Sequence, residues 1–233
     1  MKTSAASAKD NRQARGAATR RSLMRAAEKL IAQHGFGNVT IRDILTEAEQ
    51  KNTSALQYHF NGLKGLVEAI HAERSRQTQA KRAELLAELM DSTTTPDLRQ
   101  LCQLMIRPVF ELARAQVDFR RYIKAFGQEL ALSESSALSQ ASRRGGGGSS
   151  GQQLGLLLRH ALSQLDDAAF GRRLESAVRF CAASMYHHAR QKNAFRGEEA
   201  DLFINSLIDA LTGLLSAPES EATRAIARRL QQA

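Results

Sequence analysis

A short polar segment, Thr53–Phe60, carries the side chains best suited to chemistry with a nucleic acid. Their hydroxyl, amide and imidazole groups can form hydrogen bonds with phosphates and with the edges of bases. These groups belong to Thr53, Ser54, Gln57, Tyr58 and His59. The apolar side of the segment offers only Ala55, Leu56 and Phe60. We therefore predict a short helix over 53–60 that exposes one polar face.

Two further helices are predicted to position this segment. Apolar residues recur at helical spacing between Leu23 and Ile31, which indicates a helix that starts at Thr19 and ends at His34, before Gly35. A second helix begins at Thr40, where Asp43 three residues later completes a capping box. A polar turn over 49–52 leads into the third helix, and Asn61 and Gly62 separate it from a fourth that starts near Leu63. Two short helices joined by a tight turn form a candidate helix-turn-helix.

The distribution of charge agrees with a polyanionic partner for this region. The chain has 233 residues and a formal net charge of +9. Residues 1–66 hold 11 Lys and Arg against 5 Asp and Glu, whereas the remaining 167 residues hold 22 against 19. A basic N-terminal third beside a nearly neutral remainder favours DNA binding, although a solvated basic arm would give the same charge.

The whole chain is predicted to be all-α. Three prolines, no tryptophan and 42% apolar residues form a helix-favouring composition that can bury a core. No strand-like alternation of useful length occurs. Further helices are predicted over 97–114, 116–130, 152–165, 168–192 and 199–216. The glycine- and serine-rich stretch 133–151 is predicted to be a flexible loop.

The run from Thr19 to Ile70 resembles the DNA-binding domain of the TetR family of transcriptional regulators. The matching parts are the Gly35-Phe36 end of the first helix, the sequence TIRDI at the start of the second, and Tyr58-His59-Phe60 before a Gly-x-Lys-x-Leu start to the fourth. The resemblance covers about 50 of the 233 residues. It implies a helix-turn-helix domain followed by a helical domain that binds a ligand and dimerises.

The resemblance also implies roles for individual residues. Thr40 and Lys64 would hold phosphates at helix starts, and Tyr58 and His59 would contact the backbone. Thr53, Ser54, Ala55 and Gln57 would face base edges in the major groove. Arg42, Lys51 and Asn52 would contact phosphates or bases, and Arg12, Arg15, Arg20 and Arg21 of the N-terminal arm would follow the DNA backbone or enter a minor groove.

These residues also have ordinary structural explanations. Tyr58 could pack as an aromatic lid on the core, His59 could be a surface histidine, and Gln57 and Lys51 could simply be solvated. The family pattern is also broken in two places. Its usual turn glycine is Glu49 here, and the turn is one residue longer than the commonest form. Glu49 is an acid close to phosphates and is expected to point away from DNA.

The C-terminal part is predicted to hold the dimer interface and a ligand pocket. Apolar stripes run along 168–192 and 199–216, and the second is wider than one neighbouring helix requires, which favours a four-helix bundle with a second chain. An unknown small-molecule effector would bind among the middle helices, and the residues chosen for this pocket are Met105, Phe110, Tyr122, Phe126, Met185 and His187. Each of these could also be ordinary core.

Together these patterns predict four segments. They are a flexible basic arm over 1–18, a helix-turn-helix domain over 19–66, a helical ligand-binding and dimerisation domain over 67–218 and a C-terminal tail over 219–233. The predicted function is that of a dimeric repressor that leaves a near-palindromic operator when an effector binds. A helical small-molecule-binding or interaction protein without specific operator reading is the alternative.

Several other classes of function lack support in the sequence. No nucleophile motif, spaced acid pair or phosphate-binding loop points to an enzyme, and we expect no cofactor. Cys102 and Cys181 lie in apolar helical patterns and are predicted to be buried thiols. Cys181 and His188 share a helical face, but two ligands without a third do not predict a metal site. No signal peptide or membrane span is recognised, so a bacterial cytoplasmic protein that associates with the nucleoid is expected.

Overall fold

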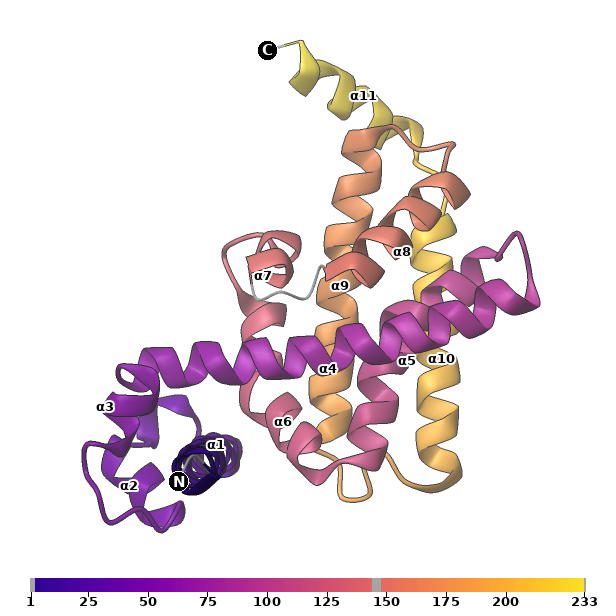
Figure 1. The fold of residues 1–233 in the computed structure, drawn as a ribbon. Coiled ribbons are helices and arrows are strands. Elements are labelled where there is room, and N and C mark those ends of the chain that lie inside the picture. Colours follow the sequence, from indigo (N-terminus) through magenta and orange to yellow (C-terminus); the bar gives the residue numbers. More distant parts are fainter. Residues whose placement is uncertain (1–2, 144–147, 233) are drawn as a thin grey trace.

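The computed structural model describes residues 3–143 and 148–232, and the regular elements within these ranges are all helical (Figure 1). The predicted all-α fold is confirmed. We call the N-terminal part of the molecule the head and the remainder the body. The head contains α1 (Thr3–His34), the 3₁₀ turn η1 (Phe36–Asn38), α2 (Ile41–Glu47), α3 (Ala55–Phe60) and the first turns of α4 (Leu63–Ser92).

The body is a bundle that α4 crosses on one side (Figure 1). Its helices are α5 (Leu98–Ala115), α6 (Val117–Leu132), α7 (Ala137–Arg143), α8 (Gly148–Ala161), α9 (Asp167–Ala189), α10 (Gly197–Ser216) and α11 (Glu221–Gln231). Polar caps start several of them: Asp97 and Gln100 form a capping box on α5, and the Asp166 carboxylate accepts the Ala169 N–H at the start of α9.

The head has its own hydrophobic core. Apolar side chains of α1, α2 and α3 meet there, among them Leu23, Ile44 and Leu56, which are almost completely buried. Leu66 and Ile70 of α4 complete this core from one side. Phe126 of α6 belongs to the same cluster, so the body contributes directly to the core of the head.

A buried ion pair also joins α1 to α4. The guanidinium of Arg74 donates two hydrogen bonds to the carboxylate of Glu28, over 2.7 and 2.6 Å. The side chains of Glu28 and Arg74 are 1% and 9% exposed. Burial raises the pKa of Glu28, and the hydrogen bonds and charge of Arg74 oppose this rise. Burial alone would lower the pKa of Arg74, but the hydrogen bonds and charge of Glu28 raise it.

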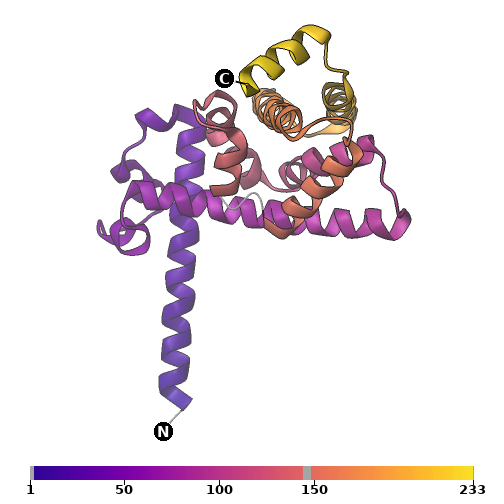
Figure 2. The ribbon, with the colours of Figure 1, turned by 90° about the horizontal axis from the view of Figure 1, so that it is seen from above.

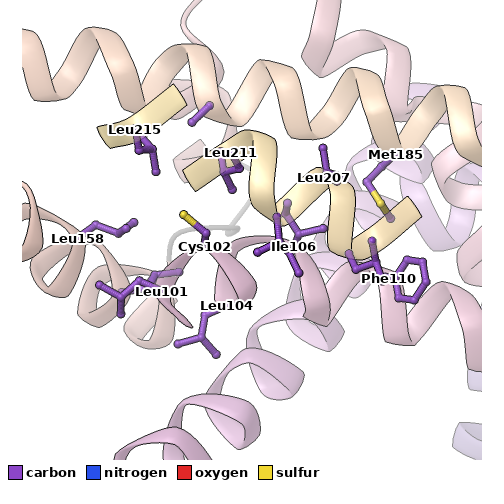
Figure 3. Close-up of a cluster of buried hydrophobic side chains, with 14 of the residues drawn as sticks. Leu101, Cys102, Leu104, Ile106, Phe110, Leu158, Met185, Leu207, Leu211 and Leu215 are labelled. Carbon is purple, nitrogen blue, oxygen red and sulfur yellow. The ribbon is translucent and has the colours of Figure 1, made fainter. Parts of the chain in front are cut away.

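The core of the body lies largely between α5 and α10 (Figure 3). Leu207, Leu211 and Leu215 occur every fourth residue of α10 and face α5, where Ile106 and Cys102 are buried. This spacing places three leucines along one side of the helix, and they bury the predicted apolar stripe within a single chain. Part of the stripe that was expected to lie at an interface is therefore used within the chain.

A carboxylate on α9 holds the segment between α6 and α7. Glu175 accepts hydrogen bonds from the Ser136 hydroxyl and from the backbone N–H groups of Ala137 and Leu138. Arg179 donates to Glu175 and to the carbonyl oxygens of Ser133 and Ser135. Burial of Glu175 opposes its ionisation, but these hydrogen bonds lower the pKa of Glu175 to about 2.

The structure differs from the sequence-based segments in three places. The first helix starts at Thr3, so the predicted start at Thr19 is wrong and the basic arm continues the helix. The predicted loop over 133–151 contains α7 and the first turn of α8, while its residues Gly145, Gly146 and Gly147 lie outside the described ranges. The predicted tail contains α11, whose start is capped by the Ser220 hydroxyl.

The predicted boundary at residue 66 falls inside α4, which serves both the head and the body. Within the described residues, no single helix is long and apolar enough to span a membrane, and α10 with α11 would qualify only as a pair bent by 61°.

Gly65 is predicted to be indispensable to the head. A Cβ atom built at Gly65 would lie 1.8 Å from the carbonyl oxygen of Phe60, so any side chain would push α3 and α4 apart. Gly65→Ala should lower the free energy of unfolding by at least about 3 kcal/mol, measured by urea denaturation followed by circular dichroism. Gly171→Ala on α9 is the control, because a Cβ there has no neighbour within 4 Å. Equal stability of the two variants would contradict this account.

Glu175 is predicted to make the protein acid-sensitive. Glu175→Gln removes a carboxylate that accepts several hydrogen bonds, and should destabilise the protein by about 1–2 kcal/mol at pH 6. Because the pKa of Glu175 is lowered to about 2, this contribution is complete above the unfolded-state pKa of about 4.5 and is lost as the pH falls towards 2.

Urea titrations at several pH values between 6 and 3 would test this prediction, since the difference between wild type and Glu175→Gln should shrink steadily as the pH falls. The control is Glu88→Gln, which changes an exposed glutamate on α4. A difference that stays constant with pH would show that the charge of Glu175 contributes nothing.

Candidate nucleic-acid interface

The helix-turn-helix begins with the capping box predicted from the sequence. The Thr40 hydroxyl accepts the Asp43 N–H over 3.2 Å, and the Asp43 carboxylate accepts the Thr40 N–H over 2.9 Å. The Thr40 hydroxyl also donates to this carboxylate over 2.7 Å. These hydrogen bonds lower the pKa of Asp43. A phosphate contact by the Thr40 hydroxyl would therefore compete with Asp43, whereas Arg42 beside it is exposed.

The turn between α2 and α3 is built without the usual glycine. Glu49 adopts a left-handed backbone conformation with φ 53°, and its side chain is exposed. The side-chain oxygen of Asn52 accepts the Ser54 N–H over 2.9 Å, which shapes the end of the turn. Glu49 therefore takes the left-handed conformation that favours glycine, and its backbone is strained.

Helix α3 exposes most of the side chains that the sequence selected. Tyr58 is 83% exposed, so the alternative of a core lid is wrong. Lys51, Asn52, Thr53, Ser54 and Gln57 are exposed and His59 is half-buried. The helix starts at Ala55, and so Thr53 and Ser54 belong to the turn.

Ala55 does not fit its predicted contact with base edges. Its side chain is 6% exposed and packs in the core of the head, because it lies on the same side of α3 as Leu56 and Phe60. Ala55 therefore supports α3 from beneath. The amide of Gln57 donates to the side chain of Asn61 over 2.8 Å, which holds Gln57 along the exposed side of the helix.

Two cationic residues lie at the junction of α3 and α4, next to the exposed side of α3 that carries Gln57 and Tyr58. Asn61 and Gly62 both have positive φ, of 57° and 105°, and reverse the chain within two residues. Lys64 is exposed in the first turn of α4. The guanidinium of Arg20 on α1 lies 4.8 Å from the centre of the Phe60 ring, at the C-terminal end of α3.

The N-terminal half of α1 passes this surface and extends away from the body (Figure 2). A Cβ atom at Gly16 would lie 3.9 Å from the ring of His59, so α1 runs beside the end of α3. Arg15 and Arg21 are exposed, and the side chain of Arg12 lies outside the described part of the chain. The head therefore combines an exposed polar helix with cations contributed by α1 and α4.

Residues 23–70 match the family model described as bacterial regulatory proteins, tetR family. The match covers α2, α3 and the parts of α1 and α4 that pack on them. The head of the chain is therefore similar, over its helix-turn-helix, to the bacterial regulatory proteins of the tetR family.

Solved structures show the same fold over most of the chain. A TetR family transcription regulator from Marinobacter aquaeolei VT8 is 14% identical, with a TM-score of 0.54 over 85% of this chain and 97% of its own. Salmonella enterica GusR is 17% identical, with a TM-score of 0.50 over 85% of this chain and 96% of its own. No curated protein matches the chain in sequence. These likenesses show that the fold of these structures includes both the head and the body.

The body contains a cavity of about 470 Å³. Met105, Tyr122, Phe126 and Met185 line it, as the sequence-based choice of pocket residues expects. The other two choices lie elsewhere. Phe110 packs against Phe195 and Phe203, and the ring of His187 is exposed beside Gln191. His187 follows Met185 by two residues, which turns it about 200° around α9 and away from the cavity.

The polar wall of the cavity was not predicted from the sequence. It consists of five residues of α4, namely His71, Arg74, Ser75, Thr78 and Arg82. Most of these residues are three or four positions apart, which places them on one side of a helix. This spacing does not stand out in the sequence, because α4 contains many other charged and polar residues. The ring of His71 lies 3.2 Å from the Tyr122 hydroxyl, so α4 and α6 are joined across the cavity edge.

Both cysteines are free thiols. Cys102 is buried as predicted, whereas Cys181 is partly exposed at the cavity, and burial raises its pKa to about 12. His188 stacks on Phe203 with ring centres 3.8 Å apart. Within the described ranges, no group of three or more metal-binding side chains occurs.

Glu49 provides a test of the turn geometry. A left-handed conformation costs a residue with a Cβ about 1–2 kcal/mol, and glycine escapes this cost but loses more chain entropy on folding. Glu49→Gly should therefore stabilise the head by about 0.5–1 kcal/mol, measured by urea denaturation.

Glu49→Ala is the matched control for this prediction. It removes the same charge and keeps the Cβ atom, so its stability should not exceed that of the wild type. An equal gain from Gly and Ala would assign the effect to charge and contradict the explanation by backbone strain.

Proposed function

We propose that the protein is a dimeric, sequence-specific regulator that represses transcription and leaves its operator when a small molecule binds. The observation that carries this proposal is the exposed polar side of α3 between the cations of α1 and α4. Tyr58, which is 83% exposed, and Lys64 would contact phosphates, and Thr53, Ser54 and Gln57 would meet base edges. Such a protein would act at the bacterial nucleoid, in the cytoplasm.

The outer side of α9 and α10 is the proposed dimer interface. Leu202 on α10 is 70% exposed, and the exposed residues that follow it at helical spacing, Ser206, Ala210 and Gly213, are small. Small side chains allow two helices to approach closely, and Leu202 would gain burial from a second copy. A two-fold axis through this face would set two α3 helices about 34–36 Å apart on a near-palindromic operator.

Effector binding would act through α4. This helix lines the cavity with one part and forms the core of the head with another, through Leu66 and Ile70. A ligand that prefers a different position of α4 would change the spacing of the two heads and release the DNA. The cavity fits equally a ligand-binding protein without operator reading, and so DNA binding is the decisive property.

An electrophoretic mobility-shift titration with DNA from upstream of the protein's own gene would test the proposal. At about 150 mM salt, competition by unrelated DNA removes binding that depends only on phosphates. We expect a discrete complex that survives this competitor. Replacing both Tyr58 and Lys64 by Ala should weaken the binding of this DNA at least about tenfold, because each replacement removes a phosphate contact.

Lys192→Ala is the charge-matched control, because it removes one exposed cation far along the chain from the head. It should leave operator affinity unchanged. A complex that any DNA displaces equally, or one that tolerates the double replacement, would refute operator reading by α3 and favour the ligand-binding alternative.

A further inference from the structure

Among the described residues that line the cavity in the body, the charged ones are cationic. Arg74 and Arg82 lie two turns apart on one side of α4, with the hydroxyls of Ser75 and Thr78 between them. None of the described residues that line the cavity is Asp or Glu. The polar wall therefore offers positive charge and hydrogen-bond donors to whatever occupies the cavity.

The remaining walls are mostly apolar. Met105 and Val109 of α5, Phe119 and Phe126 of α6, and Val178 and Met185 of α9 face the same space. A multiply charged ligand, such as a nucleotide, would lose hydration against these walls without enough cations to replace it. A ligand with one anionic end and an apolar body matches both sides of the cavity.

The two arginines differ in the contacts of their guanidinium groups. Arg82 donates to the carbonyl oxygen of Leu104 over 3.4 Å, and burial lowers the pKa of its guanidinium. Arg74 binds Glu28 of the head through two hydrogen bonds and lies 5.7 Å from the centre of the Phe119 ring. A second carboxylate near Arg74 would thus share this guanidinium with Glu28.

We propose that the cavity binds an amphipathic monocarboxylate, an aryl or medium-chain aliphatic acid, whose carboxylate pairs with Arg82 and Arg74 in competition with Glu28. Guanidinium groups match carboxylates in plane and in charge, which selects this anion over a neutral ligand of the same shape. This proposal names the effector class of the regulator described under the proposed function, and it rests on that function.

The competition connects the ligand to the head. Glu28 is buried, and a weaker bond to Arg74 leaves its charge without full compensation. The contact between α1 and α4 therefore loosens when the acid binds. Coupling of this kind is reciprocal: whatever weakens the bond between Glu28 and Arg74 strengthens binding of the acid.

Isothermal titration calorimetry of the full chain without DNA would test the ligand class. The probes are 2-naphthoate, its neutral analogue 2-naphthamide, and decanoate, whose apolar part is an aliphatic chain. We expect 2-naphthoate to bind at least about tenfold more tightly than 2-naphthamide. Arg82→Met should remove most of this preference and leave 2-naphthamide binding unchanged.

Arg74 requires a paired replacement, because Arg74→Met alone would leave Glu28 buried with its charge. The double variant Glu28→Gln/Arg74→Met removes both charges and should also lose the preference for the acid. Glu28→Gln alone should bind 2-naphthoate about fivefold more tightly, since the competing carboxylate is gone. A merely structural role of the pair would not increase affinity. Arg76→Met, at an exposed arginine of α4 that pairs with Glu73, is the control.

Equal binding of 2-naphthoate and 2-naphthamide, or no binding of either acid, would overturn the proposal. A preference that survives Arg82→Met and the double variant would do the same, as would unchanged or weaker binding by Glu28→Gln. Circular dichroism confirms folding of each variant. Because these titrations contain no DNA, specific operator binding without acid preference refutes only this proposal, whereas acid preference without operator binding refutes only the proposed function.

Discussion

The buried pair between Glu28 and Arg74 is the interaction on which the relation of head and body depends. It joins α1 to α4 at the point where α4 leaves the core of the head and enters the wall of the cavity. Removing one partner of such a pair leaves a buried charge and typically costs about 3–5 kcal/mol. Phe126 strengthens the same junction, because it packs into the head from α6 while it also lines the cavity. The cavity therefore lies next to the helices that pack against α3.

The position of α3 is determined by backbone geometry as much as by its apolar residues. Three features of the backbone determine the position of α3. They are the strained Glu49 in the preceding turn, the positive φ of Gly62, and the close approach of Gly65 to the Phe60 carbonyl. These features leave little conformational freedom between α3 and α4. A surface that reads DNA through a few side chains needs this rigidity, since hydrogen bonds to bases tolerate little displacement.

Local signals predicted much of the head. The capping box of Thr40 and Asp43, the end of α1 before Gly35 and the exposed side of α3 depend on neighbours within four residues, and the structure agrees with each. The N-terminal extension of α1, helix α7 and helix α11 were missed. The first two contain many alanines and polar residues with little apolar periodicity, so a search for amphipathic stripes does not detect them. Helix α11 differs, because Ala222, Ile226 and Leu230 recur every fourth residue and form a stripe that the sequence-based prediction overlooked.

The sequence by itself determined the all-α fold, the helix-turn-helix and the polar residues that it exposes, because helix periodicity, caps and turns are short-range properties. Only the tertiary structure decided which side chains share the cavity. It brought Arg74 and Arg82 to face Met105 and Met185, turned Phe110 and His187 away, and buried Ala55 beneath the surface it was expected to form. These outcomes depend on the rotation of each helix against partners that are distant in the sequence. A pattern along one helix defines its faces but not the neighbour that each face meets.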